Sequence, residues 1–277
     1  MKMTQKVLGP YDMANQNQHF GGWTQSTGGE IVMAFPVEGW QSSAAVTVRQ
    51  TDAHTVAGSV HGPSQAWDQA MSVLSLDFDG SGYAEVGERD PIMGALQREH
   101  SYLRPVLFHS PYEAACAFVI AHRLRIEQGR AIRARMAQEH GESFDVDGTI
   151  VHAFPAPQRL LEITSVQGIN DEKVARLHGI AAAALDGRLD RARLREMPVD
   201  EAVADVRKLR GIGEFFAVAI VMRGAGLLDA APNDDITRSG IERFYGTDDV
   251  TRVTEGWRPY RMWCSVLVHA SERGARG

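Results

Sequence analysis

Cysteine is scarce in this sequence, with two residues among 277, Cys116 and Cys264. The two lie far apart in apolar surroundings, so this chain alone cannot supply the ligands of a cysteine-rich metal cluster. So few cysteines are typical of proteins from a reducing compartment, where disulfides rarely persist. These observations favour a cytoplasmic protein.

Long apolar runs are missing as well. No stretch approaches the roughly 20 residues that a membrane-spanning helix needs, and no apolar segment follows the basic start at residues 1–6. We therefore expect neither a membrane span nor a secretory signal. The sequence also lacks a His-Glu-x-x-His or Cys-x-x-Cys pattern, which leaves a catalytic zinc without support.

Positive charge is not in excess either. The chain has 29 Lys and Arg against 35 Asp and Glu, a net charge of −6, whereas nucleic-acid binding usually relies on a basic footprint. Positive charge is nevertheless dense in one mostly helical stretch, which contains Arg123, Arg125, Arg130, Arg133 and Arg135. This stretch is either a solvated helix face or a phosphate-binding surface, and the residues alone favour neither.

The chain is long enough for two or three small domains, and its 44% hydrophobic content is typical of a soluble globular protein. Residues 30–61 hold short apolar or alternating runs separated by Gly, Pro, Ser and Asp, which predicts an antiparallel sheet. Helical spacing over residues 63–76 places Trp67 and Met71 on one side. We expect residues 1–95 to form an α+β domain.

The pattern changes after this unit. Ser110 and Pro111 are the residue types that cap and open a helix, and helical periodicity recurs with short loops through residues 96–277. Asp145, Asp147 and Gly148 predict a loop. Further helices are expected at residues 127–140, 157–163, 171–185, 199–209, 214–223, 234–245 and 259–271.

The most informative stretch is residues 208–216, which predicts a helix, a tight turn and a second helix. Gly211 and Gly213 allow a turn that a Cβ would obstruct. The turn presents N–H groups at the start of the second helix, and such groups suit a phosphate. An acidic pair, Asp234 and Asp235, follows. Together these features indicate a surface that grips a nucleic-acid backbone and holds one acid beside a sugar.

Several motifs extend this interpretation. They are Pro10-Tyr11-Asp12, Ser110-Pro111-Tyr112-Glu113-Ala114, Phe154-Pro155-Ala156-Pro157-Gln158-Arg159-Leu160, Leu209 to Gly213, Asp234-Asp235 and Trp257-Arg258-Pro259-Tyr260-Arg261. In this order they resemble the helix-hairpin-helix superfamily of DNA base-excision glycosylases, and within it the bacterial 3-methyladenine DNA glycosylase II enzymes. The resemblance implies a sheet with a packed helix, followed by two helical subdomains with the DNA cleft between them and the hairpin near residues 199–224.

The resemblance implies an activity. The enzyme would hydrolyse the N-glycosidic bond of an alkylated purine, such as 3-methyladenine or 7-methylguanine, in double-stranded DNA and leave an abasic site. Asp235 would stabilise the positive charge that develops near C1′, while Asn233 or Asp234 caps the following helix. Relatives that also cut the strand carry a lysine where this chain has Phe215, so no lyase step is expected.

The target base must leave the duplex stack to be reached. By resemblance, the wedge that fills the gap is Arg123 or Leu124. The alternatives are a surface charge for Arg123 and core packing for Leu124. The resemblance assigns the DNA backbone to four hairpin residues, namely Gly211, Gly213, Glu214 and Phe215.

A cationic alkylated base can be held by stacking and cation–π attraction, each contributing about 1–2 kcal/mol. The resemblance and the aromatic residues suggest a base pocket made of Phe20, Phe118, His122, Phe215, Trp263 and His269. For Phe118 and Trp263, ordinary core packing is the favoured interpretation.

A second motif competes for a function. Residues 77–88, from Asp77 to Glu88, nearly satisfy the EF-hand loop formula, with Ser81 at the fifth place. Pro91 in the would-be exit helix and the lack of a second loop count against calcium, so a surface turn is the alternative. The resemblance also implies a monovalent cation at the hairpin carbonyls. No other cofactor is expected.

Two further functions stay open. The chain could be a DNA-binding lesion sensor with little catalysis, since its wedge and pocket differ from the family's and its net charge is negative. It could also be a glycosylase for a different damaged base, such as a deaminated or oxidised one. A cytoplasmic, nucleoid-associated monomer acting on damaged double-stranded DNA is the simplest expectation.

Overall fold

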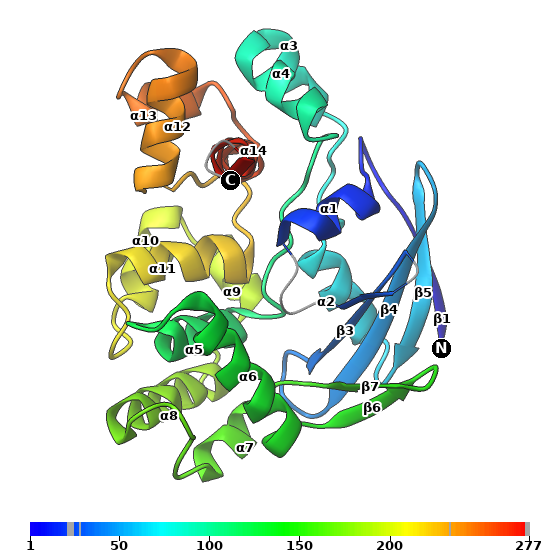
Figure 1. Cartoon of the computed structure of the whole chain (residues 1–277), viewed down its shortest axis with the longest axis vertical. Coiled ribbons are helices and arrows are strands. Elements are labelled where there is room, and N and C mark those ends of the chain that lie inside the picture. The colour runs from blue at the N-terminus through cyan, green and yellow to red at the C-terminus, as the bar shows by residue number, and fades with distance from the viewer. Residues whose placement is uncertain (21–24, 28, 233, 275–277) are drawn as a thin grey trace.

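The structure is a computed structural model and describes residues 1–20, 25–27, 29–232 and 234–274. Its N-terminal part is an antiparallel sheet of five strands in the order β1-β5-β4-β3-β2, as the sequence predicted (Figure 1). The bounds of the strands are β1 Lys2–Lys6, β2 Gln25–Thr27, β3 Glu30–Pro36, β4 Ser43–Asp52 and β5 Thr55–His61. At its centre Met33 pairs with Val46, which pairs with Val60, and all three side chains are buried.

Two helices lie between the sheet and the rest of the protein, α1 (Met13–Phe20) and α2 (Gln65–Val73) (Figure 1). The predicted apolar side of α2 is confirmed, because Trp67 and Met71 are almost completely buried. Burying a side chain of this size contributes roughly 1.5–3 kcal/mol relative to leaving it in water. The helix is therefore fixed mainly by its apolar side.

A β-hairpin replaces the loop that was expected near residue 147. Strands β6 (Ser143–Val146) and β7 (Thr149–His152) are joined by Asp147 and Gly148, which both have positive φ, at 51° and 83°. Two consecutive positive φ values are the signature of the tight turn that matches strand twist. The hairpin packs Val146 and Val151 against the sheet, which explains why β3 and β4 are buried on both faces.

Two short helices occupy the segment with the calcium-loop pattern and the residues after it, α3 (Tyr83–Arg89) and α4 (Pro91–Glu99). The two cross closely, since a Cβ on Gly87 would lie 2.6 Å from the Cα of Gly94. The predicted domain boundary at residue 95 falls inside α4, whose end lies near the C-terminal helix. The division of the chain at this residue stays a prediction.

The rest of the chain is mostly helical, as predicted. The helices are α5 (Pro111–Ala121), α6 (Ile126–His140), α7 (Pro157–Glu162), α8 (Asp171–Leu185), α9 (Arg191–Glu196), α10 (Val199–Val206), α11 (Glu214–Ile220), α12 (Asp235–Tyr245), α13 (Val250–Glu255) and α14 (Arg261–Gly274), with a π-helical turn, η1 (Val221–Ala225), after α11. Figure 1 shows α5 to α8 grouped below α9 to α11, with α12 to α14 above them. None of the described helices is long and apolar enough to cross a bilayer.

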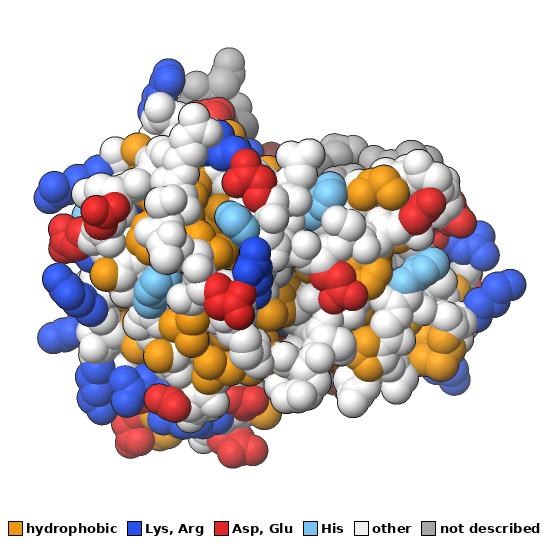
Figure 2. All heavy atoms as spheres, turned by 90° about the horizontal axis from the view of Figure 1, so that it is seen from below, with side chains coloured by type: hydrophobic (Ala, Val, Ile, Leu, Met, Phe, Trp, Pro, Cys, Tyr) orange, Lys and Arg blue, Asp and Glu red, His pale blue; other side chains and the backbone are white. Residues whose placement is uncertain are grey.

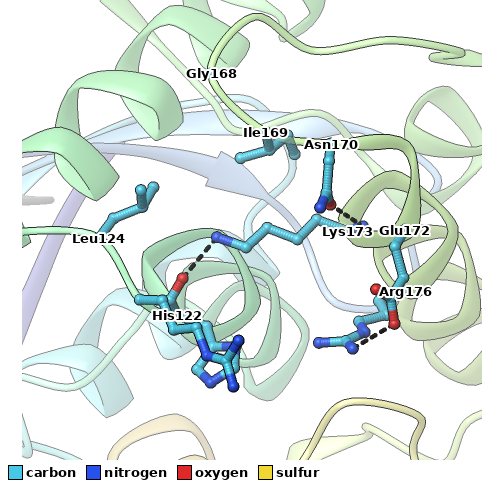
Figure 3. Close-up of a pocket in the computed structure, with 9 residues that line it drawn as sticks. His122, Leu124, Gly168, Ile169, Asn170, Glu172, Lys173 and Arg176 are labelled. Carbon is cyan, nitrogen blue, oxygen red and sulfur yellow. Dashed lines mark hydrogen bonds and ion pairs between the residues drawn. The ribbon is translucent and has the colours of Figure 1, made fainter.

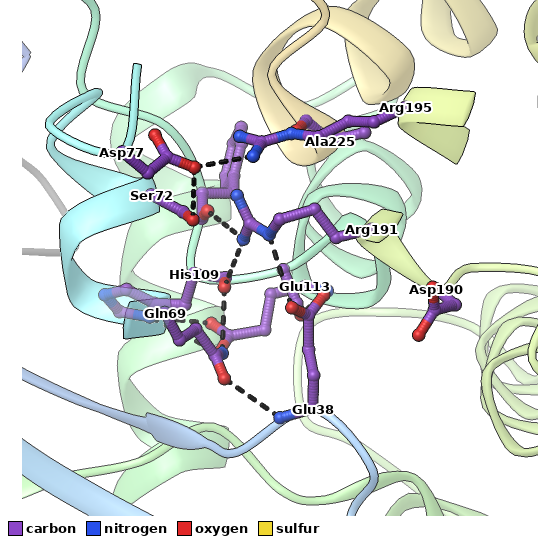
Figure 4. A network of polar contacts seen from close by, with 12 residues as sticks. Glu38, Gln69, Ser72, Asp77, His109, Glu113, Asp190, Arg191, Arg195 and Ala225 are labelled. Atoms are coloured by element: carbon purple, nitrogen blue, oxygen red, sulfur yellow. Dashed lines mark hydrogen bonds and ion pairs between the residues drawn. The ribbon is translucent and has the colours of Figure 1, made fainter. Parts of the chain in front are cut away.

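A buried polar network ties the sheet to the helices (Figure 4). Glu113 of α5 is completely buried and lies 3.2 Å from His109, and it also pairs with Arg133 of α6. Next to them, Arg191 of α9 donates to the carbonyl of His109 at 2.6 Å and contacts Glu38, which follows β3, at 3.3 Å. Buried charges must be paired to be tolerated, so these contacts fix how the two parts of the chain dock.

Candidate functional site

The predicted hairpin lies between α10 and α11. Gly211 has φ of +88°, a conformation that L side chains rarely adopt, and a Cβ there would lie 2.6 Å from Cδ of Arg176. Gly213 is the N-cap of α11 and brings no side chain to bond the first turn. The first N–H groups of α11 are therefore not blocked by a cap, which is the arrangement that an anion can use.

The other two predicted backbone-binding residues begin α11. Glu214 is exposed, and its carboxylate pairs with Arg207 on the opposite side of the turn. Phe215 is the most exposed large apolar side chain of the helical part after Ile126, at 63%. An exposed aromatic at the start of a helix has no role in the core and is available to a ligand.

An aromatic group joins the end of α5 to the start of α11. The rings of Phe118 and Phe216 are stacked with centroids 5.2 Å apart, and the edge of His122 meets Phe216 at 5.8 Å. Phe215 adjoins Phe216 at 5.8 Å. The structure thus brings together three predicted pocket residues, Phe118, His122 and Phe215. Phe216, which the sequence interpretation missed, is the ring that connects them.

Trp263 is not part of this group. It is fully buried, with Arg104 above its ring at 4.7 Å and Tyr83 edge-on at 5.0 Å. The pocket assignment of Trp263 is therefore corrected to a core role, which was the stated alternative. Phe20 ends α1, but its side chain lies outside the part of the chain that the structure describes.

The acidic pair sits at the start of α12, and its two members differ. Asp234 is the N-cap, accepts a hydrogen bond from the Thr237 N–H at 2.8 Å, and has a side chain that is 17% exposed. Burial alone would raise the pKa of Asp234, but His269 and the N–H groups of Thr237 and Ile236 lower it to about 2. Asp234 is therefore a fixed, ionised cap.

Asp235 is free, as the sequence interpretation expected for the second acid of the pair. Its side chain is fully exposed and has one loose ion pair, 3.7 Å from Arg238 on the next turn. It lies in the first turn of α12, where the helix N-terminus stabilises a negative charge. This carboxylate can approach a ligand without breaking a structural contact.

The predicted wedge residues lie in the loop after α5. Arg123 is exposed and has φ of +59°, a value that is strained for a bulky residue. Leu124 is half-buried and packs against the core. Arg123 therefore projects from the loop, whereas Leu124 fits the alternative of core packing better.

A pocket of about 520 Å³ opens beside this loop (Figure 3). Leu124 and Ile169 line it together with residues of α8, and the Lys173 ammonium reaches across to the carbonyl oxygens of Ile120 and His122 at 2.8 and 2.7 Å. Lys173 thereby caps the C-terminal end of α5. The contact fixes the loop that carries Arg123 to the start of α8.

The arginine-rich stretch is divided between two roles. Arg133 points inward to Glu113 and lies over Phe154 at 5.8 Å, and Arg135 donates to the carbonyl of Gln167 at 2.6 Å. Arg123, Arg125 and Arg130 are exposed. The stretch is thus neither a purely solvated face nor a uniform phosphate-binding surface.

The described contacts give the calcium-loop alternative no support. The Asp77 carboxylate forms an ion pair with Arg195 at 2.5 Å and accepts a hydrogen bond from the Ser72 hydroxyl at 2.6 Å. Residues 83–88 are helical and do not form a loop that surrounds an ion. Within the described ranges, no three His, Cys, Asp or Glu side chains are grouped to hold a metal ion. A monovalent cation at the hairpin carbonyls stays a prediction.

Comparison with known proteins finds relatives of similar sequence. No protein-family profile matches the chain. A DNA-3-methyladenine glycosylase of Bacillus subtilis is 22% identical over 206 residues, which cover 70% of this chain and 68% of that protein. A putative DNA-3-methyladenine glycosylase of the same organism is 23% identical over 191 residues, or 65% of each chain.

The fold has solved counterparts. A 3-methyladenine DNA-glycosylase from Archaeoglobus fulgidus matches with a TM-score of 0.80 and 16% identity, over 98% of both chains. An 8-oxoguanine glycosylase/lyase from Clostridium acetobutylicum matches with a TM-score of 0.72 and 15% identity, over 97% of both chains. The chain is thus similar in sequence to DNA-3-methyladenine glycosylases and shares its fold with solved DNA glycosylases.

Proposed function

We propose that this protein is a monofunctional DNA glycosylase that removes alkylated purines of the 3-methyladenine and 7-methylguanine type from double-stranded DNA and leaves an abasic site. The observation that carries the proposal is the acidic pair on α12. Asp234 satisfies the helix terminus, so the exposed carboxylate of Asp235 is free to face a deoxyribose. The sequence relatives named for 3-methyladenine favour this substrate class.

The chemistry follows from the charge that bond cleavage creates. As the base departs, positive charge develops near C1′, and the Asp235 carboxylate stabilises this charge more in the transition state than in the ground state. The same carboxylate can orient the water that attacks C1′. Because an alkylated purine already carries positive charge, its departure needs no second acid.

The aromatic group of Phe118, Phe216 and His122 is our candidate for the wall of the base pocket, with Phe215 at its exposed edge. Stacked rings hold a flat cationic base by dispersion and cation–π attraction. Arg123 is our candidate for the wedge, because its loop holds it outward in a strained conformation. We propose that the protein acts as a monomer.

We expect no lyase step because of where the lysines of this chain lie and what they contact. There are four, Lys2, Lys6, Lys173 and Lys208, and the first two lie in β1. Lys173 is bound to two carbonyl oxygens and Lys208 contacts Asp205 at 3.2 Å. A Schiff base needs an uncommitted amine at the sugar, and position 215 holds Phe. Borohydride trapping on damaged DNA is therefore expected to give no covalent complex.

The test is release of free bases from methylated duplex DNA, measured by chromatography. The protein is expected to release 3-methyladenine, and Asp235→Asn to lower the rate by roughly two to three orders of magnitude. Asp248→Asn, which removes an equally exposed charge after α12, is expected to keep the rate. Tight binding without any release would instead support the lesion sensor, and release of only oxidised or deaminated bases would support the other glycosylase.

A further inference from the structure

The pocket beside the Arg123 loop shares His122 and Arg123 with the site proposed above, but its α8 residues Glu172, Lys173 and Arg176 have no role in that chemistry. Its charged lining residues are three cations and one carboxylate, Arg123, Lys173, Arg176 and Glu172. Their formal charges sum to +2, on a chain whose net charge is −6. On the face seen in Figure 2, basic and acidic side chains are intermixed and no continuous basic field is visible. A locally positive pocket is therefore a distinct feature of a chain whose net charge is negative.

The one carboxylate of the pocket is already neutralised. Arg176 donates to Glu172 at 2.5 Å, and Arg210 of the hairpin lies 3.9 Å from the same oxygen. The hydrogen bond and the charge of Arg176 lower the pKa of Glu172, with smaller contributions from Arg210 and Arg123. A guanidinium has five N–H donors, so Arg176 and Arg210 keep donors for another anion.

Arg123 adds a further cation. Among the described residues its guanidinium donates no hydrogen bond, and it lines the pocket from the loop after α5. Because Arg123 is also our candidate for the wedge, the phosphate contact is assigned to Arg176, whose planar guanidinium suits phosphate oxygens.

The pocket is also pre-organised. Lys173 fixes its α5 side through two carbonyl oxygens. On the other side, the Arg176 side chain lies against Gly211, where any Cβ would displace it. Lys173 and Arg176 are therefore held at fixed positions relative to the hairpin, and binding an anion there needs little rearrangement.

We propose that this pocket is a second DNA-backbone site, which binds a phosphodiester beside the one held by the hairpin. The inference rests on the proposed function only in taking DNA as the ligand. If the wedge enters the duplex from the Arg123 loop, the positively charged walls of the pocket beside that loop face the DNA backbone. The strand that supplies the phosphate is decided by experiment.

The test measures binding of the full chain to an undamaged fluorescent duplex of about 20 base pairs over a series of KCl concentrations. One phosphate contact contributes about 0.9 to the log–log slope. Arg176→Gln is expected to reduce the slope by about that amount, which corresponds to roughly eightfold weaker binding at 0.1 M KCl. Arg176→Lys is expected to keep the slope, and Glu172→Gln to bind more tightly than the unsubstituted protein.

The matched control is Arg49→Gln, which removes an exposed charge from β4 of the sheet and is expected to leave the slope unchanged. Thermal unfolding of each variant checks that the fold is intact. Equal slopes for Arg176→Gln and Arg49→Gln, or weaker binding by Glu172→Gln, would overturn the proposal.

Duplexes with a single methylphosphonate, placed in turn along each strand, locate the contact. One neutral linkage is expected to weaken binding of the unsubstituted protein but not of Arg176→Gln. If no position in either strand behaves in this way, the pocket does not bind a phosphate and the proposal is overturned. These measurements need no base release, so a protein that binds as expected but releases no base would refute the proposed function alone.

Discussion

His269 and Asp234 are in contact across the start of α12, with Nε2 of the imidazole 3.4 Å from Oδ1 of the carboxylate. The same Nε2 lies 2.9 Å from the Thr237 hydroxyl. The contact joins α14 to the N-terminal turn of α12. His269, which the sequence assigned to the base pocket, is therefore placed to position this turn, and Asp235 is the next residue along it.

This contact predicts how stability depends on pH. The pKa of Asp234 is about 2 in the folded protein and about 3.9 when unfolded. A lowered pKa stabilises the fold above about pH 4, and the contribution is lost as the pH falls toward 2. We expect it to be at most about 2.5 kcal/mol at neutral pH.

The measurement is urea unfolding of Asp234→Asn, which keeps a capping side chain but removes the charge. The variant is expected to be less stable at pH 6 and to approach the unsubstituted protein at pH 2.5. A deficit that is equal at both pH values would contradict the ion-pair explanation.

The buried Glu113 predicts a large structural effect. Burial opposes its ionisation, but His109 and Arg133 outweigh this and lower the pKa of Glu113. Removing the carboxylate leaves the Arg133 charge without its buried partner, so Glu113→Gln is expected to cost about 3–5 kcal/mol. Thermal and urea unfolding measure this loss of stability. Glu139→Gln, on the exposed side of α6, serves as the control and is expected to change stability by less than about 0.5 kcal/mol.

Phe215 and Phe216 are neighbours, and we expect their replacement by alanine to affect stability differently. Phe216 stacks on Phe118, so Phe216→Ala is expected to lower the free energy of unfolding by roughly 2–3 kcal/mol. Phe215 is 63% exposed, so Phe215→Ala is expected to leave stability within about 0.5 kcal/mol and to weaken DNA binding. Unfolding and DNA titration of both variants separate the two roles. Equal stability losses would refute the assignment.

The positive φ of Arg123 predicts a specific order of stability. Glycine tolerates this conformation without strain, whereas alanine does not. Arg123→Gly is therefore expected to be more stable than Arg123→Ala by about 0.5–1 kcal/mol. If Arg123 is the wedge, both variants lose base release to a similar degree. Retained release in both would exclude Arg123 from that role while leaving the strain argument intact.

Much of the fold was predictable because its signals are local. Ser110 and Pro111 begin α5 as predicted, with the Ser110 hydroxyl accepting from the Glu113 N–H at 3.1 Å. The hairpin of β6 and β7 was missed although Asp147-Gly148 is a turn signal, because strands of four residues are too short to show a clear alternating pattern. Their pairing depends on the sheet surface that they cover.

The position of the site along the chain was predictable, but the contacts of its side chains were not. Spacing placed Asp234 and Asp235 after the hairpin, and the structure then distinguished the cap from the free acid. Trp263 was misassigned because sequence gives a residue's place along a helix and not its depth in the core. Phe216 was overlooked since only the three-dimensional packing shows which ring meets Phe118.

The hydrogen bonds from Lys173 to the end of α5 have a mechanical consequence. They join the Arg123 loop, α8 and, through Arg176 and Gly211, the hairpin into one stiff frame. A protein built in this way cannot adjust these parts separately to a straight duplex. We therefore expect DNA to bend to fit the protein, so that sequences or lesions that soften the helix are engaged first.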